Sequence, residues 1–263
     1  MAKLKFIFFL LFLSSSSLFA LYTGNPAEPI LLKKGIVSPL NTLVTVTTGY
    51  LYTQVFDMDL IPKEIPDEVS IEKMGDTELF SNMASLGLII LKRLEVYGYL
   101  GTSKENIDWT SKIPFTSDKL DVKSHFAFSV GAKAIMLQFG GTVFSLDFQY
   151  FTLPSTEKLI PRIVNIYMPI PIGKQYLKMN EWQIAGGVAS KIGPFTPYIG
   201  GKYSHVRLKV KSTEGIPDLV FRRRHNYGMF VGASLNFSFL MSATFEARLF
   251  DETAISAAVN MVF

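Results

Sequence analysis

Charged and amide side chains recur at alternate positions within the apolar segments of this chain. Because successive side chains of a β-strand point to opposite faces, these polar residues share one face and the large apolar residues share the other. In a closed sheet within a membrane the polar face lines the lumen, where its charges decide which ions pass. The lumen and selectivity candidates are Glu95, Lys133, Asp147, Gln149, Gln183, Lys191, Lys202, Glu246 and Arg248.

The same polar residues have a second interpretation, in which they pair with one another inside a narrow, plugged interior. Barrels of about eight strands are filled by their own side chains, whereas barrels of about 16 strands leave an aqueous channel. A count of ten to twelve strands lies between these cases. The sequence therefore leaves both a water-filled path and a filled lumen as hypotheses.

A basic run, Arg222, Arg223 and Arg224 followed by His225, ends one of the polar links between strands. One hypothesis is a surface site for anionic lipopolysaccharide, a sulfated glycan or an anionic solute. The alternative is a solvated rim, since runs of like charge are usually solvated.

No catalytic or metal-binding motif is recognisable. The three histidines, His125, His205 and His225, are far apart in sequence and lack metal-ligand spacing. There is no G-x-S-x-G motif to support the hypothesis of an outer-membrane hydrolase. The chain has no cysteine, which excludes disulfides, thiolate metal sites and a cysteine nucleophile. We therefore predict no catalytic residue, no metal and no cofactor.

The first 20 residues are typical of a secretory signal peptide. Lys3 and Lys5 precede an apolar run that reaches Leu13, and cleavage is expected after Ala20. The predicted domains are a signal peptide over 1–20, a periplasmic N-terminal segment over 21–41 and an outer-membrane β-barrel over 42–263.

The composition fits an exported membrane protein without transmembrane helices. Hydrophobic residues make up 48% of the chain and the mean hydropathy is +0.26. Beyond the signal peptide there is no run of about 18 apolar residues, the length that a spanning helix needs. A formal net charge of +4 gives no support for a nucleic-acid partner.

Alternation predicts ten strands, each about 10 residues long, enough to span the roughly 25 Å apolar band of an outer-membrane barrel. A change of phase within the seventh strand predicts a β-bulge. The last strand places Ile255, Val259 and the terminal Phe263 on one apolar face, and Phe263 is the predicted C-terminal assembly signal. The predicted strands cover about 42–56, 82–91, 93–102, 125–134, 144–150, 181–191, 197–210, 227–237, 241–249 and 254–263.

Short and long links alternate along the chain, as periplasmic turns and outer loops do in barrels. The short links lie near 91–93, 135–139, 192–196 and 237–240, and the long ones at 57–81, 103–123, 153–180 and 211–225. The apolar stretch 163–172 could add two strands, giving twelve, although its prolines argue against this. The fold class is thus all-β, a transmembrane antiparallel up-and-down β-barrel; a soluble β-sandwich is the alternative.

Several ordered blocks of the sequence resemble the chlamydial major outer membrane protein family. The blocks span nearly the whole chain after the predicted cleavage site. They are Gly24–Pro29, Gly49–Tyr50 with Val55–Asp57, Ser129–Ala134, Phe148–Tyr150, Glu181–Gln183, Phe195–Gly200 and Glu246–Glu252, running into Phe263.

The resemblance implies an outer-membrane porin, typically trimeric, that admits small solutes by passive diffusion and stiffens the envelope. Its expected partners are outer-membrane lipid and lipopolysaccharide, the barrel-assembly machinery and copies of itself in a homotrimer. Two departures matter: this chain has no cysteine for the family's disulfide network, and it is shorter than family members. The alternative function is a narrow, closed-lumen structural or adhesive barrel that acts through its surface loops.

Overall fold

A computed structural model describes most of the chain after the predicted signal peptide. The described residues are 21–31, 44–58, 60–64, 71–111, 117–121, 124–157, 160–163, 175–212, 219–238 and 240–263. Within these ranges the regular structure consists of β-strands and one short helix, α2 (Glu28–Leu31). No described helix has the length and apolar character needed to cross a membrane. The predicted signal peptide, residues 1–20, lies outside this part of the chain.

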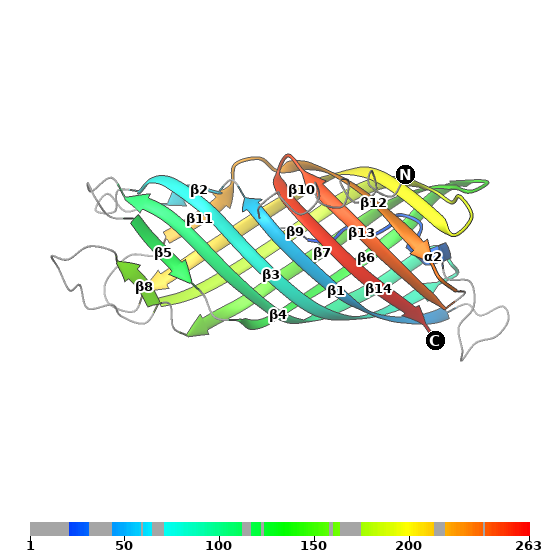
Figure 1. Ribbon diagram of the computed structural model, residues 1–263, viewed down its shortest axis with the longest axis horizontal. Coiled ribbons are helices and arrows are strands. Elements are labelled where there is room, and N and C mark those ends of the chain that lie inside the picture. Colours follow the sequence, from blue (N-terminus) through cyan, green and yellow to red (C-terminus); the bar gives the residue numbers. More distant parts are fainter. Residues whose placement is uncertain are drawn as a thin grey trace, which may run out of the picture.

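Ten antiparallel strands close into a barrel (Figure 1). Each strand pairs with the next along the chain, β14 pairs with β1, and β12 pairs with β10. The predicted all-β up-and-down barrel is confirmed, with ten strands in its wall. They are β1 (Val44–Met58), β3 (Ile71–Ile90), β4 (Leu94–Ser111), β6 (His125–Phe139), β7 (Thr142–Glu157), β9 (Gln175–Ser190), β10 (Phe195–Ser212), β12 (Tyr227–Asn236), β13 (Met241–Leu249) and β14 (Glu252–Val262).

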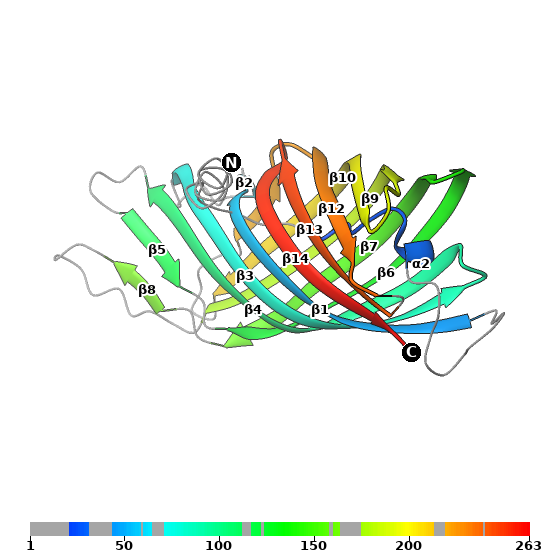
Figure 2. The same cartoon turned by 45° about the vertical axis from the view of Figure 1, so that its right-hand side comes forward.

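The two ends of the barrel differ. Short turns and the C-terminus lie at one end, called here the turn end, and the long links lie at the other, called the loop end (Figures 1 and 2). Much of what the sequence predicts as long loops consists of strand extensions and four short strands at the loop end. These are β2 (Leu60–Glu64), β5 (Ser117–Asp121), β8 (Ile160–Ile163) and β11 (Leu219–Arg223).

The short strands enlarge the wall only at the loop end. β11 pairs with both β10 and β2, next to the three shortest barrel strands, β12 to β14. β5 pairs with β4 and β8. β8 ends at Ile163, the first residue of the apolar stretch 163–172, and it pairs outside the barrel wall. Residues 164–172 lie outside the described part of the chain.

One predicted link is misplaced. The sequence predicts a turn near 135–139, but β6 continues to Phe139 through a register shift between Ile135 and Leu137. The turn is formed instead by Gly140 and Gly141. Gly140 has a φ of 57°, a left-handed conformation that glycine adopts without steric cost.

The β-bulge predicted in the seventh strand is also wrong. β10 pairs with β9 without a register shift from Tyr198 to Ser212. The apolar residues change sides because their surroundings change: Ile199 faces outward, whereas Val206 and Leu208, nearer the loop end, face inward and are buried. Beyond the lipid the outside of the wall meets water, so the apolar side chains turn to the interior.

An apolar belt surrounds the outside of the barrel between its two ends. Its side chains are 39–64% exposed, and an apolar surface this extensive marks a membrane contact. The belt includes Val46, Leu86, Leu88, Val96, Leu100, Phe126, Val130, Phe148, Ile184, Val188, Ile199, Val231, Phe245 and Val259. The sequence alternation therefore predicted the lipid-facing side of the wall correctly.

We expect Ile184→Arg, within the belt on β9, to lower the free energy of unfolding by about 1–3 kcal/mol, because the cost of a basic side chain rises from about 0–1 kcal/mol at the interface to about 2–4 kcal/mol at the bilayer midplane. Asn180→Arg is the matched control, four residues along the same outward face toward the loop end, where the cost falls to about 0–1 kcal/mol. Urea titration of the barrel in lipid vesicles measures both. Equal losses in the two variants would contradict this placement of the belt.

Candidate functional site

The segment that follows the predicted signal peptide lies inside the barrel. Residues 21–27 are all buried, and the segment leads to α2 inside the wall near the turn end (Figure 2). The sequence places residues 21–41 in the periplasm; over the described part, 21–31, the structure places them in the lumen instead. Sequence patterns gave no indication of this, because the partners of the segment lie on distant strands.

Glu246 on β13 holds the start of this lumen segment. Its carboxylate accepts hydrogen bonds from the backbone amides of Thr23 and Gly24, both at 3.0 Å. The same carboxylate accepts a hydrogen bond from the Tyr198 hydroxyl at 3.0 Å, and one oxygen lies 3.6 Å from the Arg248 guanidinium. Glu246 is thus the hydrogen-bond acceptor for two backbone amides that would otherwise be buried without partners.

Asn25 attaches the segment to two neighbouring strands of the wall, β10 and β12. Its side-chain amide donates to the Thr196 carbonyl oxygen at 3.0 Å and to the Ser234 hydroxyl at 2.9 Å. Its side-chain oxygen accepts a hydrogen bond from the Ala27 amide at 2.8 Å, which shapes the turn into α2. Asn25 is fully buried, so all of these bonds are shielded from water.

Glu28 in α2 forms the ionic contact between the segment and the wall. Its carboxylate pairs with the Lys133 ammonium on β6 and accepts a hydrogen bond from the Asn260 amide at 2.9 Å. The Tyr22 hydroxyl also donates to this carboxylate, at 3.4 Å. Burial raises the pKa of Tyr22 well above its usual value, so its hydroxyl remains a neutral donor.

The wall adds further polar groups around Lys133. The Tyr97 hydroxyl donates to Asp147 at 2.7 Å, and the Lys133 ammonium lies 6.0 Å from the centre of the Tyr97 ring. Glu95 is buried on the same side of the lumen and lies opposite Lys133 in the β4–β6 register. The lumen near the turn end therefore holds one lysine among three carboxylates, including that of Glu28.

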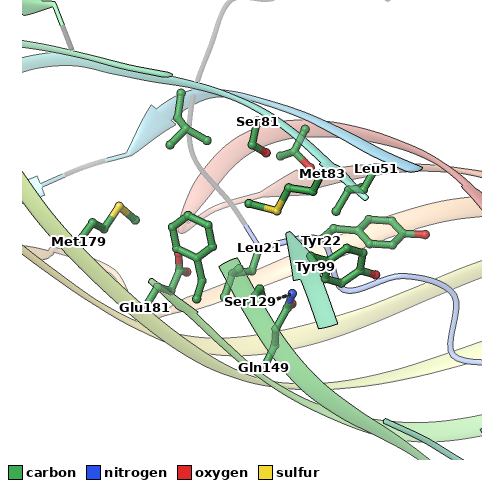
Figure 3. Close-up of a pocket in the computed structure, with 13 residues that line it drawn as sticks. Leu21, Tyr22, Leu51, Ser81, Met83, Tyr99, Ser129, Gln149, Met179 and Glu181 are labelled. Atoms are coloured by element: carbon green, nitrogen blue, oxygen red, sulfur yellow. Dashed lines mark hydrogen bonds between the residues drawn. The ribbon is translucent and has the colours of Figure 1, made fainter. Parts of the chain in front are cut away.

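The middle of the lumen is nearly filled. The Gln149 amide donates to the Ser129 hydroxyl at 2.9 Å, and the Gln183 amide donates to Gln149 at 3.1 Å. The cavity beside them has a volume of about 20 Å³, which leaves room for little more than one water. Figure 3 shows the residues of the segment and of the wall that line it, among them Leu21, Tyr22, Leu51, Ser81, Met83, Tyr99, Ser129, Gln149, Met179 and Glu181.

A second ionic cluster lies on the inner side of the wall. The Arg223 guanidinium contacts Asp251 at 2.7 Å, Glu252 at 3.0 Å and Glu181 at 3.2 Å. Lys202 pairs with Glu252 and lies 3.2 Å from Asp251. All five side chains are almost completely buried, and together they join β9, β10, β11, the turn after β13 and the start of β14.

Most of the predicted lumen residues do face the interior. The buried, inward-facing ones are Glu95, Lys133, Asp147, Gln149, Gln183, Lys202, Glu246 and Arg248. Lys191 is wrong: β9 ends at Ser190, so alternation stops there, and Lys191 lies half-exposed in the turn. The selectivity role of the inward residues stays a prediction.

The predicted surface basic patch is only partly at the surface. Arg222 and Arg224 are exposed, but Arg223 is wrong because it lies between them on β11 and points inward to its three carboxylates. A sequence cue existed: Arg223 follows Phe221 by two positions and so shares its buried face. Glu181 likewise precedes the inward Gln183 by two positions, but its role was not predicted.

Asn25 and Glu28 could be noticed from the sequence only as part of the family block 24–29, without a role. The described residues contain no group of three or more histidine or acidic side chains arranged to hold a metal ion. His125 lies on β6, whereas His205 on β10 and His225 just after β11 lie on neighbouring strands.

Curated proteins with detectable sequence similarity include the major outer membrane porins of Chlamydia trachomatis. The porin of serovar A is 27% identical, over 73% of this chain and 72% of that protein. The porins of serovars C and D are 26% and 25% identical over 73% of this chain and 71% of those proteins. No protein-family model matches the chain.

Solved structures with a similar strand arrangement include other barrels. The translocator domain of the autotransporter NalP from Neisseria meningitidis aligns with a TM-score of 0.40 at 9% identity, over 85% of this chain and 89% of that one. The outer membrane protease OmpT from Escherichia coli gives 0.38 at 10% identity, over 84% and 96%.

The toluene transporter TbuX from Ralstonia pickettii gives a TM-score of 0.37 at 8% identity, over 94% of each chain. Scores this low add nothing to the fold, which the closed strand order already establishes. The sequence relatives and the apolar belt are what place the barrel in a membrane. This chain is a distant relative of the chlamydial major outer membrane porins, and its barrel lies in the outer membrane.

Proposed function

We propose that this chain is a porin without enzymatic activity, which lets ions and small solutes diffuse passively and contributes to the cell envelope. The observation that carries the proposal is its similarity, over nearly three quarters of its length, to proteins named major outer membrane porins. In this proposal the signal peptide is cleaved after Ala20, the loop end faces outside and the turn end faces the periplasm. The homotrimer and the role of Phe263 in assembly stay predictions.

The proposal requires that residues 21–31 leave or shift within the lumen for solutes to pass. The segment is held by hydrogen bonds and one ion pair, without a covalent link to the wall. A neutral hydrogen bond contributes about 0.5–1.5 kcal/mol net and one to a charged group about 1.5–3 kcal/mol, and water replaces these bonds when the segment moves, without unfolding the barrel. The ten-strand ladder stays intact when they break.

A specific observation supports the alternative of a closed-lumen structural barrel. With the segment in place, the central cavity has room for about one water. A barrel whose segment never moves does not conduct and acts only through its wall and loops. The experiment that decides between the two functions must therefore control the position of the segment.

A cysteine lock provides that control, because the chain has no cysteine of its own. The side chains of Asn25 and Ser234 are in hydrogen-bond contact at 2.9 Å, so Asn25→Cys/Ser234→Cys brings two thiols together. In residues 21–263 refolded into a planar bilayer, we expect discrete conductance steps from the reduced variant that disappear on oxidation and return on reduction.

The two single-cysteine variants are the matched controls, since they lose the same hydrogen bond but cannot form the lock. Their conductance should not respond to oxidation. Heat-modifiable migration on a gel verifies that each variant is folded. If folded, reduced and unlocked barrels never conduct, the porin proposal is wrong and the closed-lumen alternative is supported.

Lys133 should influence which ions pass. Lys133→Gln removes the single lysine among Glu28, Glu95 and Asp147, so the lumen becomes more negative and cations should be favoured. A unit charge at close range contributes about 1 kcal/mol in water, which corresponds to roughly a fivefold rise in the cation-to-anion permeability ratio. Reversal potentials in a salt gradient measure this ratio.

Lys191→Gln is the matched control, because it removes the same charge from a turn outside the lumen. It should leave the reversal potential unchanged. Equal shifts in both variants would show that overall charge, rather than the lumen, sets the preference.

The wall cluster around Arg223 should contribute to the stability of the barrel. Arg223→Gln leaves Glu181, Asp251 and Glu252 with Lys202 as the remaining cation of the cluster, and breaking a buried pair costs about 3–5 kcal/mol of folding free energy. Urea titration in vesicles measures the loss.

The exposed neighbour Arg222 supplies the control for this prediction. Arg222→Gln should change the free energy of unfolding by no more than about 0.5 kcal/mol, as is usual for surface positions. A similar loss in both variants would mean that the Arg223 contacts do not stabilise the wall.

A further inference from the structure

Basic side chains gather on the outer surface of β9 and β10 near the loop end. Lys178, Asn180, Arg207 and Lys209 line a surface depression of about 260 Å³. These positions alternate with the buried Met179, Val206 and Leu208, so the polar side chains point away from the barrel. The four residues are called the basic hollow below.

Strand pairing explains why these side chains lie together. Lys178 is opposite Lys209, and Asn180 is opposite Arg207, which is in turn opposite the exposed Arg222 on β11. β10 and β11 contain no acidic residue, and the one acidic residue of β9, Glu181, is buried against Arg223. The described outward side chains of β9, β10 and β11 therefore include basic groups and no acidic one.

The basic hollow lies at the height where lipid headgroups are expected. Two residues nearer the turn end, Trp182 and His205 form an aromatic pair with ring centres 6.0 Å apart, and Trp182 also contacts Tyr203 at 5.5 Å. The next outward residue of β9, Ile184, belongs to the apolar belt. Aromatic girdles mark the membrane interface of barrels, so a charge just beyond them meets headgroups.

The same order of side chains recurs on the neighbouring strands. A second depression, of about 430 Å³, is lined by Arg224, His225, Asn226, Tyr227 and Phe250. Tyr227 and Phe250 are 74% and 75% exposed, with the basic residues lying beyond them toward the loop end. The positive face thus extends from β9 to the start of β12.

We propose that the basic hollow binds the phosphorylated headgroup of an anionic lipid in the outer leaflet. Arginine and lysine are the side chains that recognise phosphate, arginine through paired hydrogen bonds. The hollow offers both, at headgroup height and on a face without an outward carboxylate in β9 to β11. This site depends on the orientation proposed above but does not require the barrel to conduct.

Trp182, two positions from Asn180, provides a local probe. The chain has two tryptophans, so Trp109→Phe leaves Trp182 as the only one. In vesicles of phosphatidylcholine, Trp182 fluorescence is quenched by brominated lipid next to it. We expect brominated phosphatidylglycerol to quench more than brominated phosphatidylcholine at equal mole fraction, with a relative binding constant of about five or more, since one basic side chain contributes about fivefold.

In the Trp109→Phe protein, Lys178→Gln/Arg207→Gln should reduce the binding constant of phosphatidylglycerol relative to phosphatidylcholine to about one. Lys92→Asn/Arg93→Gln removes two charges from the exposed turn between β3 and β4 and should retain the full preference. Quenching by brominated phosphatidylcholine should be the same in all three proteins, which verifies that each is inserted and folded.

Equal quenching by the two lipids in the parent, or a preference that survives Lys178→Gln/Arg207→Gln, would overturn the proposal. Loss of heparin binding in that variant, with no lipid preference in the parent, would assign the hollow to a sulfated glycan instead. Loss of trimers on a native gel, again with no lipid preference, would assign it to contact between subunits.

Discussion

Closure of the backbone hydrogen-bond ladder between the first and last strands, β1 and β14, is the constraint on which the rest of this structure depends. In lipid an unpaired strand edge has no water to satisfy its amides and carbonyls, so the sheet must close. Ten strands complete the circle here. A circle of this size encloses little more space than its own side chains fill. The narrow lumen, and the need to fill it, both follow from closure.

A narrow lumen changes what its charges require. Alternation directs Glu246, Lys133 and Arg223 to the interior, where little bulk water reaches them and an unpaired charge costs several kcal/mol. The wall alone compensates the charge of Arg223, through three carboxylates. It does not satisfy Glu246 in the same way: two of the hydrogen bonds to this carboxylate come from backbone amides of the segment 21–31. The segment thus supplies hydrogen bonds that the buried Glu246 carboxylate of the wall needs as long as water is absent from the lumen.

Local pattern and long-range contact explain what the sequence could and could not predict. All ten barrel strands follow from alternation, because it is a local property of the sequence: neighbouring residues such as Gln183 and Ile184 point to opposite faces of the wall. The placement of Asn25 beside Ser234 joins residues more than 200 positions apart, and no local pattern contains that information. Lys191 and Arg223 were misplaced for a simpler reason: alternation ends where β9 ends, and β11 was taken for a loop.

The reversal of sides along β10 bears on how solutes would cross. Near the loop end the interior is an apolar cluster that includes Val55, Leu208 and Phe221, built like the core of a soluble protein. Water enters apolar constrictions reluctantly, and such constrictions limit ion flow even when they are wide enough for an ion. Leu21 and Tyr22 of the segment 21–31 belong to this cluster, so displacing the segment frees the half of the lumen lined by Lys133 and Glu246 and loosens the cluster without removing it. The wall residues of the cluster stay in series with the polar half, so the unlocked pore should conduct less than a barrel that is polar throughout its length.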